Sequence, residues 1–429
     1  MPSPTRRQFL AALGSVGVVS TAGCVSVDRP SHEGRWPREP NTYVTDTDGP
    51  GWNTEIAWSS ETRGGPSPTM PVVADGSVYH LDSRTANHEH SGGTWLAEFD
   101  AGNGEKRWET RLWETDEYYY FYHLGPPVLD GDRLFAQTHG GVKAISTDGE
   151  ILWTFRNFGT GHLAPDSTPP IVTDELVVVG SYGTWRKAVP EQLYALDRES
   201  GDVVWSHEFG MNDHFWQLTR NGDTFFAPLS AENSRLLELD ISTGETIRQY
   251  SVSPVSSVTL TENLVITPVR RGPRTFALVA FARDTTEIQW QNDADVFEAE
   301  IVVNGDRFYH SHVGELTARR TDTGEVLWQV GGPSEDIVIN ADSTPVIAGD
   351  SLYIAASRFL GERKGYGRII LVLDPETGSE RGHLVPWPDT NSWFSTPAIV
   401  DGAMYLDSRH GLVCLEDCAA DAFGHCLLG

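Results

Sequence analysis

The sequence predicts an all-β protein, an eight-bladed β-propeller of four-stranded antiparallel blades that is closed by an N-terminal strand. The main observation is a phrase that recurs about every 35 to 50 residues: an apolar stretch, an Asp, a Gly-containing turn and usually a Trp, as in Leu193–Trp205. Before each phrase lie two more short strands, introduced by Pro and split by a tight turn such as Asp401-Gly402. Four-strand units at a fixed period, with no convincing amphipathic helix between them, indicate a ring of blades.

The chemistry of one repeat explains its third and fourth strands. In Leu193–Asp197 apolar residues fall on both faces of a strand, as expected for a sheet covered on both sides by neighbouring blades. The carboxylate of Asp197 is placed to accept hydrogen bonds from the amides of its own turn, and Gly201 can adopt a positive φ there. Trp205 ends the unit as a large apolar anchor.

Eight units can be counted from the positions at which first strands begin. These positions lie near Met70, Pro126, Thr168, Gln217, Val258, Glu300, Thr344 and Thr396. The last unit, Thr396–Glu416, lacks an outer strand, whereas Trp52–Ser60 carries Trp58 at the position of the repeat Trp with no strands before it. We therefore expect Trp52–Ser60 to pair with Gly411–Glu416 as the outer strand of blade 8. Seven blades and an irregular hairpin are the alternative.

The composition narrows the range of partners and environments. The chain has 60 Asp and Glu against 32 Lys and Arg, for a net charge of −28, and only four of the cations are Lys. Such a surface repels phosphates and argues against nucleic-acid binding. Binding of cationic partners and solubility in concentrated salt both remain open, and the even spread of acids favours a salt-adapted organism.

The first residues look like an export signal rather than part of the fold. Arg6-Arg7 followed by Phe9-Leu10 resembles a twin-arginine signal, and Ala11–Ala22 is too short for a membrane-spanning helix. Thr21–Cys24 resembles a lipobox with Cys24 as the lipid acceptor, although cleavage elsewhere is an alternative. The predicted organisation is a signal peptide (residues 1–23), a lipid-anchored flexible tether (24–50), the propeller (51–418) and a C-terminal tail (419–429). The expected location is the outer face of the cytoplasmic membrane.

Three further cysteines lie near the C-terminus. Cys414 occupies the place of Ala195 in the repeat and is expected to be a small buried residue. Cys418 and Cys426 lie beyond the last strand, and export permits a disulfide between them. A metal site that adds His410 and His425 is the alternative, but its spacing fits no common zinc pattern, so we predict no metal.

The repeat as a whole, with its Pro, its L-x-A-L-D and its T-G-x-x-x-W, resembles the pyrroloquinoline-quinone-like (PQQ-like) propeller repeat. The resemblance covers Trp52–Glu416, with Arg248 and Gly382 replacing the Trp in blades 4 and 7. Members of this family include outer-membrane-assembly lipoprotein scaffolds and quinoprotein alcohol dehydrogenases. The dehydrogenases characteristically carry two adjacent Cys beneath the quinone and a calcium ion, and this chain has no adjacent Cys pair.

Residues that break the repeat gather on one predicted face of the ring, which we call the loop face. It is formed by the loops that join one blade to the next and by those between second and third strands. Aromatic and His side chains there could bind a protein segment, a glycan or a small ring compound, although packing between loops is the alternative. The second-to-third-strand loops add His88, His90, Tyr182, Trp185, Arg186, Arg358, Phe359, Tyr366 and His410. The candidate binding residues are Trp113, Tyr118, Tyr119, Tyr120, Tyr122, His123, His162, His214, Trp216, Trp387, Trp393 and Phe394.

These observations favour a non-catalytic, lipid-anchored scaffold that binds envelope or membrane proteins. No nucleophile elbow, phosphate loop or metalloprotease motif is present in the sequence, so we predict no catalytic residues and no cofactor. We expect a monomeric propeller. The alternative is a dehydrogenase that uses pyrroloquinoline quinone and calcium at a diverged site.

Overall fold

The computed structural model describes the chain in segments. They are 43–51, 53–62, 69–84, 86, 91–115, 125–138, 140–156, 169–180, 192–210, 214–230, 234–294, 296, 300–312, 314–333, 335–340, 343–361, 366–386, 394–408, 410–418, 421–422 and 425–426. All of them belong to one compact unit, Ser31–Gly429. Within these segments every regular element is a strand, and no helix is long and apolar enough to cross a membrane.

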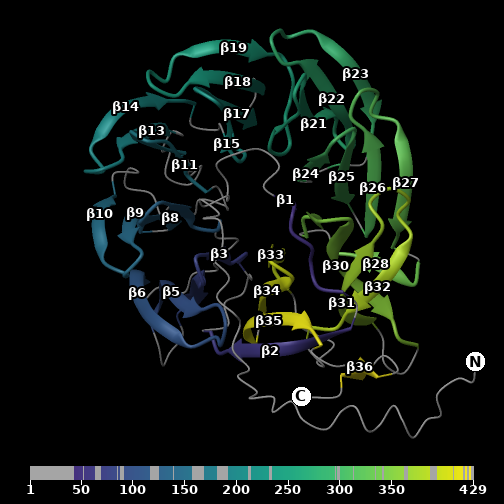
Figure 1. Cartoon of the computed structure of the whole chain (residues 1–429). Coiled ribbons are helices and arrows are strands. Elements are labelled where there is room, and N and C mark those ends of the chain that lie inside the picture. The colour runs from purple at the N-terminus through teal and green to yellow at the C-terminus, as the bar shows by residue number, and fades with distance from the viewer. Residues whose placement is uncertain are drawn as a thin grey trace, which may run out of the picture. The chain divides into compact units, whose positions relative to one another are not determined.

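Eight antiparallel sheets form a ring, which confirms the predicted eight-bladed β-propeller (Figure 1). Blade 1 comprises β3 (Val72–Ala74), β4 (Ser77–Arg84), β5 (Gly92–Asp100) and β6 (Lys106–Thr115), and blade 2 comprises β7 (Val128–Asp130), β8 (Arg133–Thr138), β9 (Gly141–Ser146) and β10 (Ile151–Phe155). Blade 3 comprises β11 (Ile171–Val172), β12 (Leu176–Gly180), β13 (Gln192–Asp197) and β14 (Val203–Glu208), and blade 4 comprises β16 (Thr219–Asn221), β17 (Thr224–Ser230), β18 (Arg235–Asp240) and β19 (Thr246–Tyr250). Blade 5 comprises β20 (Thr259–Leu260), β21 (Leu264–Gly272), β22 (Thr275–Ala282) and β23 (Ile288–Asp293), and blade 6 comprises β24 (Ile301–Asn304), β25 (Arg307–His312), β26 (Glu315–Arg320) and β27 (Val326–Gly331). Blade 7 comprises β29 (Val346–Ala348), β30 (Ser351–Phe359), β31 (Tyr366–Leu373) and β32 (Glu380–Leu384), and blade 8 comprises β33 (Ala398–Val400), β34 (Ala403–Ser408), β35 (Gly411–Asp417) and β2 (Thr54–Ser60).

Blade 8 closes the ring as the sequence predicted. Strand β2 pairs antiparallel with β35, so that Thr54 lies opposite Asp417, Trp58 opposite Cys414 and Ser60 opposite Leu412. The outer strand of the last blade therefore comes from the N-terminal side of the domain, and the alternative of seven blades is wrong.

Five short strands lie outside this scheme. Strand β15 (His214–Phe215) pairs with β17, and β28 (Ile337–Ile339) pairs with β30. Strands β36 (Asp421–Ala422) and β37 (His425–Cys426) pair with each other in the segment predicted as a tail. Strand β1 (Val44–Thr45) pairs with β29 in the segment predicted as a flexible tether, so ordered structure begins earlier than the sequence indicated.

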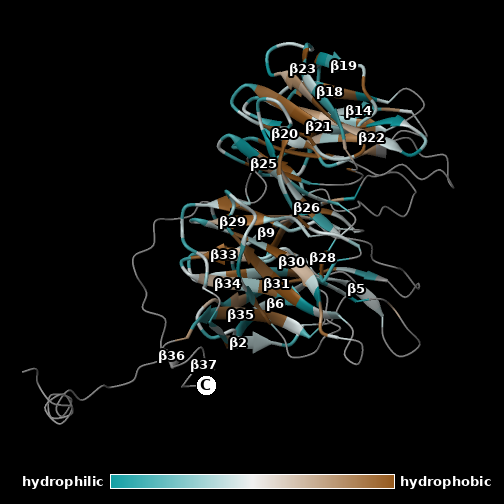
Figure 2. Cartoon of the chain, turned by 90° about the vertical axis from the view of Figure 1, so that its right-hand side faces the viewer, coloured by the Kyte–Doolittle hydropathy of each residue, from teal (hydrophilic) through white to brown (hydrophobic). Residues whose placement is uncertain are grey.

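The core consists of apolar side chains packed between neighbouring blades. In Figure 2 hydrophobic ribbon is visible in β21, β29, β33 and β35, and many of the turns are hydrophilic. One cluster, for example, joins Val128 and Phe135 of blade 2 to Val177 and Leu196 of blade 3. Because both faces of each sheet are covered, the third strands are buried except near their ends, including the polar ones such as β26.

Every outer strand carries a β-bulge at the same place. In all eight blades the register with the third strand shifts by one residue just before the position of the repeat Trp. In blade 3, for example, Val203 lies opposite Leu196, and Trp205 lies opposite Ala195, so Val204 is the extra residue. The bulge turns the Trp toward the next blade and leaves Val203 and Val204 exposed on the rim.

The repeat Trp joins each blade to the next through a contact that we call the Trp latch. The indole Nε1–H donates to a backbone carbonyl in the turn between the third and outer strands of the following blade. The pairs are Trp58 to Ala101 (2.8 Å), Trp108 to Thr147 (2.9 Å), Trp153 to Arg198 (2.9 Å), Trp205 to Ile241 (2.9 Å), Trp290 to Thr321 (2.9 Å) and Trp328 to Pro375 (3.2 Å).

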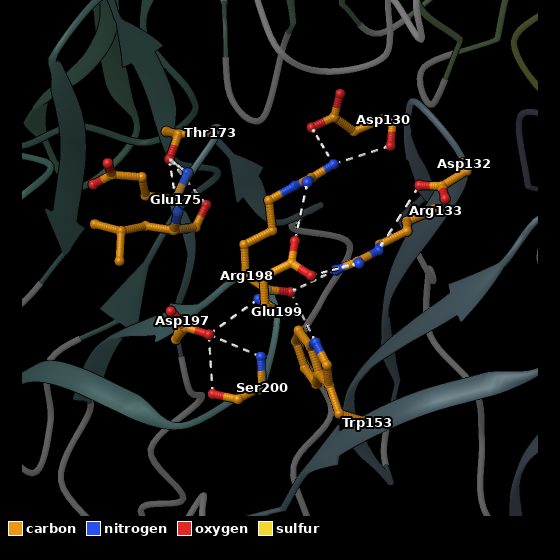
Figure 3. Close-up of polar contacts among 11 residues, drawn as sticks. Asp130, Asp132, Arg133, Trp153, Thr173, Glu175, Asp197, Arg198, Glu199 and Ser200 are labelled. Atoms are coloured by element: carbon orange, nitrogen blue, oxygen red, sulfur yellow. Dashed lines mark hydrogen bonds and ion pairs between the residues drawn. The ribbon is translucent and has the colours of Figure 1, made fainter.

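The turn that receives each Trp is built to accept it, as Figure 3 shows for blades 2 and 3. Asp197 accepts hydrogen bonds from the amides of Glu199 (3.1 Å) and Ser200 (2.8 Å), which fixes the turn. Gly201 has φ of 73°, and a Cβ there would lie 2.6 Å from the Trp153 ring. The Asp and Gly of the repeat are therefore explained by turn geometry and by close packing on the Trp.

The two blades without a Trp follow the same logic. In blade 4, Arg248 donates to the carbonyl of Arg283 at 3.3 Å, the equivalent acceptor in blade 5, and also pairs with Glu238 at 2.6 Å. In blade 7, Gly382 replaces the Trp, and the following blade is blade 8. The third and outer strands of blade 8, β35 and β2, are not joined by a turn, so this blade lacks the turn carbonyl that accepts a Trp latch. The segment before β2 provides a contact with blade 7 instead, because Tyr353 Oη donates a hydrogen bond to the Pro50 carbonyl at 2.9 Å.

Candidate functional site

The loop face contains most of the predicted binding residues, and the described segments cover part of it. Eight candidates lie outside the described residues: Tyr118, Tyr119, Tyr120, Tyr122, His123, His162, Trp387 and Trp393. His214 is the first residue of β15 by its backbone, and its side chain does not belong to the described part of the chain. Cys24 also lies outside it. The binding and lipidation roles of these residues stay predictions.

Three candidates on this face are described, and each makes contacts within the ring. Trp113, near the end of β6, is half-buried, and a Cβ on Gly140 of blade 2 would lie 2.6 Å from its indole. Trp216 donates its Nε1–H to the Pro254 carbonyl at 3.2 Å. Phe394 is buried in the core between blades 7 and 8. These side chains contribute to packing between blades, and any part they play in binding stays a prediction.

The second and third strands of blade 7 carry an exposed apolar tip on the same face. Phe359 and Tyr366 face each other across the end of the hairpin, with ring centroids 5.4 Å apart, and Leu360 follows Phe359. Their side chains are 39%, 43% and 45% exposed. We call these three residues the blade 7 tip.

The base of the tip is rigid and polar. Strand β28 pairs with β30 and places Ile337 opposite Arg358, which widens the sheet at this point. Arg358 lies 2.6 Å from the Glu380 carboxylate and 3.0 Å from Nδ1 of His383. Arg368 donates to Asn340 Oδ1 at 2.9 Å, and burial lowers the pKa of its guanidinium. The tip therefore combines exposed apolar surface with a fixed orientation, which is the combination found in binding anchors.

The central channel of the ring is occupied on one side by the chain itself. Strand β1 runs parallel to β29, the innermost strand of blade 7, and lies in the middle of the ring (Figure 1). Beside it a cavity of about 90 Å³ remains. Its lining combines residues of 43–47 with the inner strands of blades 1, 7 and 8, and it is composed of Tyr43, Val44, Thr45, Thr47, Met70, Pro71, Val72, Val73, Val346, Pro397, Ala398, Ile399 and Val400.

This lining does not fit a calcium-bound quinone. It is apolar apart from a phenol and two Thr hydroxyls and includes no charged side chain, whereas calcium prefers several carboxylate or carbonyl oxygens. Among the described residues no group of three or more His, Cys, Asp or Glu is arranged to hold a metal ion. We therefore derive no chemistry through such a group.

The cysteines near the C-terminus differ in state. Cys414 is buried in blade 8 and is not disulfide-bonded, as its place in the repeat indicated. Cys418 is disulfide-bonded, and its backbone amide donates to the Asn53 carbonyl at 3.1 Å. The side chain of Cys426 lies outside the described residues, so the pairing of Cys418 with Cys426 stays a prediction.

Two buried His residues occupy equivalent places in the second strands of blades 1 and 6 and meet opposite charges. His80 Nε2 lies 2.9 Å from the Asp407 carboxylate of blade 8. Burial opposes its protonation, but the charge and hydrogen bond of Asp407, together with the charge of Asp82, outweigh burial and raise the pKa of His80 above its usual value. His310 accepts a hydrogen bond from Arg319 Nε at 3.0 Å, and burial together with this cation lowers the pKa of His310 to about 3. Sequence periodicity could not distinguish these two sites, because the partner of His80 belongs to another blade.

The fold and the repeat define the chain as an eight-bladed propeller of PQQ-like repeats. The family model described as "Outer membrane protein assembly factor BamB" matches residues 92–278 and 256–421, and the chain belongs to this family. BamB of Yersinia pestis is 21% identical over 338 residues, which are 73% of this chain and 77% of the relative.

Solved structures agree on the fold. BamB from Moraxella catarrhalis superposes with a TM-score of 0.58 at 14% identity, covering 84% of this chain and 99% of that one. The quinohemoprotein alcohol dehydrogenase from Comamonas testosteroni superposes with a TM-score of 0.63 at 13% identity, covering 88% and 79%. At these identities the likeness concerns the fold alone, because the same propeller occurs in an outer membrane protein assembly factor in one case and in an alcohol dehydrogenase in the other.

Proposed function

We propose that this protein is a non-catalytic scaffold that binds envelope proteins through its loop face. The observation that carries the proposal is the blade 7 tip, where Phe359, Leu360 and Tyr366 are exposed together on a braced hairpin. In a chain with a net charge of −28, a fixed apolar cluster at the end of a hairpin is suited to burial against a partner. The predicted aromatic residues of the neighbouring loops would enlarge the same surface.

We further propose that the scaffold is exported by a twin-arginine-type route and anchored through a lipid on Cys24 at the outer face of the cytoplasmic membrane of a salt-adapted organism. The signal-like N-terminus and the acidic composition support this part of the proposal. Membership of the BamB family agrees with an envelope protein that binds other proteins. Mass spectrometry of the mature N-terminus tests the lipid, which adds an acyl mass to a peptide that begins at Cys24.

Site-specific photo-crosslinking tests the binding role. A photoreactive amino acid at position 366 is expected to give a discrete crosslinked partner in intact membranes at high salt. The matched control places it at Ile247, an exposed apolar residue on the outer strand of blade 4. Identical product patterns from both positions, or none from position 366, would contradict the proposal. Replacing Tyr119, Tyr120 and Trp393 together is expected to remove the same product without unfolding the ring.

The alternative function, a quinone-dependent dehydrogenase, has a direct test. Purified protein is mixed with pyrroloquinoline quinone and calcium, and the quinone absorbance that stays with the protein after gel filtration is measured. We expect none above the level seen with denatured protein. A stoichiometric quinone chromophore would overturn the scaffold proposal.

A further inference from the structure

We propose that the inner edge of blade 7 is a binding groove for an extended peptide segment, and that Tyr43–Thr45 is its intramolecular occupant. This groove lies in the central channel, away from the blade 7 tip. The inference therefore goes beyond the proposed scaffold function, and it concerns a second kind of partner, an extended strand rather than a folded surface.

The pairing of β1 has the character of a bound segment rather than of the repeat. All other named strand pairs in the described part of the chain are antiparallel, whereas β1 is parallel to β29. Backbone hydrogen bonds join them: the Ile347 amide donates to the Tyr43 carbonyl at 2.7 Å, and the Gly349 amide donates to the Thr45 carbonyl at 3.2 Å. Parallel addition to a sheet edge by a segment distant in sequence is the geometry of β-augmentation.

Tyr43 supplies an anchor for this segment. Its phenol packs against the apolar clusters on both sides of blade 7, and its hydroxyl donates to the Glu300 carboxylate. Glu300 also accepts a hydrogen bond from Thr344 Oγ1 at 2.8 Å, so the acceptor is held in place by the groove itself. Burial and the charge of Glu300 both raise the pKa of Tyr43, which keeps the phenol protonated as a donor.

Strand β1 pairs with blade 7 along one edge and borders the cavity on another side. The cavity of about 90 Å³ separates Val44 from the inner strands of blades 1 and 8, represented by Val72 and Ile399. A two-residue strand beside a cavity makes fewer packing contacts on that side, so β1 is bound to the ring less strongly than the strands of the blades are. This arrangement favours release of the segment while the ring stays folded.

The direction of the groove defines the segment that it would accept. First strands begin at the loop face, and β1 runs parallel to one of them, so a competing strand would enter from the loop face with an aromatic residue first. At the far end the Asp48 carbonyl accepts from the Gly402 amide at 3.0 Å, and a Cβ on Gly349 would lie 2.1 Å from the Asp48 carboxylate. The preferred ligand is therefore an extended peptide that begins with an aromatic residue, a β-branched residue and a small polar residue. The rest of the peptide would cross the turns that contain Gly349 and Gly402.

Hydrogen exchange of the unmodified full chain gives the first test. Because alternate amides of a strand point to opposite sides, Ile347 faces β1, whereas Val346 and Ala348 face β30. We expect the Ile347 amide to exchange at least tenfold faster than the other two, since release of β1 exposes it without opening blade 7. Equal exchange rates at all three amides would overturn the proposal, because β1 would then open only with the blade.

Peptide binding gives the second test. A fluorescent peptide with the sequence of Asn41–Pro50 is titrated, by anisotropy at high salt, into the wild-type chain and into the Tyr43→Ala variant. We expect the variant to bind at least tenfold more tightly, because its own segment no longer competes from a high effective concentration. A peptide with Ala in place of the Tyr is the control and is expected not to bind.

The outcomes distinguish the peptide groove from the scaffold function of the loop face. Absence of peptide binding to a variant whose melting curve shows a folded ring would overturn the groove and would leave the crosslink at position 366 unaffected. If Tyr43→Ala prevents folding, the Ile347 exchange rate in the wild-type chain decides alone, because cooperative loss of β1 and the ring predicts equal rates.

Discussion

The Trp latch at the seam of the ring leads to a quantitative prediction. Trp58 is 7% exposed, its ring lies 6.0 Å from that of Tyr405, and its indole donates to the Ala101 carbonyl of blade 1. Trp58→Ala removes a buried aromatic ring and leaves a cavity, for which about 3–5 kcal/mol is typical. Trp58→Phe keeps most of the packing and loses the hydrogen bond, so we expect about 1–2 kcal/mol.

A double-mutant cycle with Gly104 tests the geometry of this latch. A Cβ on Gly104 would lie 2.3 Å from the Trp58 ring, and this Gly has φ of 71°. Gly104→Ala is therefore expected to destabilise the wild-type chain by about 2–4 kcal/mol through overpacking and backbone strain. In the Trp58→Ala background the clash disappears and only the strain remains, so the two effects are expected to fall short of additivity by at least about 1 kcal/mol.

The assay is equilibrium unfolding by denaturant at constant high salt, followed by fluorescence and circular dichroism. Trp205→Ala is the matched control, since Trp205 makes the same latch to Ile241 in the middle of the ring. Additive effects of Trp58→Ala and Gly104→Ala would refute the contact between them. An unchanged midpoint for Trp58→Ala alone would refute the role of β2 in closing the ring.

Three further predictions concern pH, disulfides and salt. Because folding raises the pKa of His80, the stability that His80 contributes is full below about pH 6.5 and is lost as the pH rises through its pKa in the folded protein. Folding lowers the pKa of His310, so the stability that depends on neutral His310 is full above about pH 6.5 and is lost as the pH falls toward 3. Melting temperature against pH is expected to lose one of these slopes in each His→Gln variant, and a profile identical to that of the wild-type chain would exclude that His as the cause of the slope. A thiol count on denatured, unreduced mature protein is expected to find Cys414 alone, and additional thiols would contradict a Cys418–Cys426 bridge or lipidation of Cys24. Lowering the ionic strength is expected to loosen or unfold the ring through repulsion among its acids, and full stability in dilute buffer would count against salt adaptation.

The ring could be predicted from the sequence because each blade repeats its own local chemistry. The Asp-Gly turn, the Pro before the first strand and the Trp after the turn each have a nearby cause, so a single unit already reveals the pattern. Trp58 could be assigned to blade 8 because it carries that pattern without the strands that normally precede it. Apart from the pairing of β2 with β35, these features depend on neighbours within a few tens of residues.

Features that depend on distant neighbours could not be predicted in the same way. Strand β1 is two residues long and lies in a polar, Pro- and Gly-containing segment, and its partner is about 300 residues away, so no periodicity marks it. The acceptor of each Trp lies in the next blade and becomes visible only when the blades are placed side by side. For the loop face, the sequence located aromatic residues, but loops lack the repeat that makes their geometry predictable.

The bulges of the outer strands have a consequence for how molecules of this protein behave toward one another. In salt near 1 M the range of electrostatic repulsion shrinks to about 3 Å, so a net charge of −28 no longer keeps two copies apart. The rim then presents pairs of exposed apolar residues, such as Val203 and Val204, on strands that form the outer edges of their sheets in the described part of the chain. An irregular edge cannot dock in register against another copy of itself. Separation between molecules would thus depend on the shape of the rim rather than on charge, and straightening one bulge by deleting its extra residue would make the ring prone to associate edge to edge.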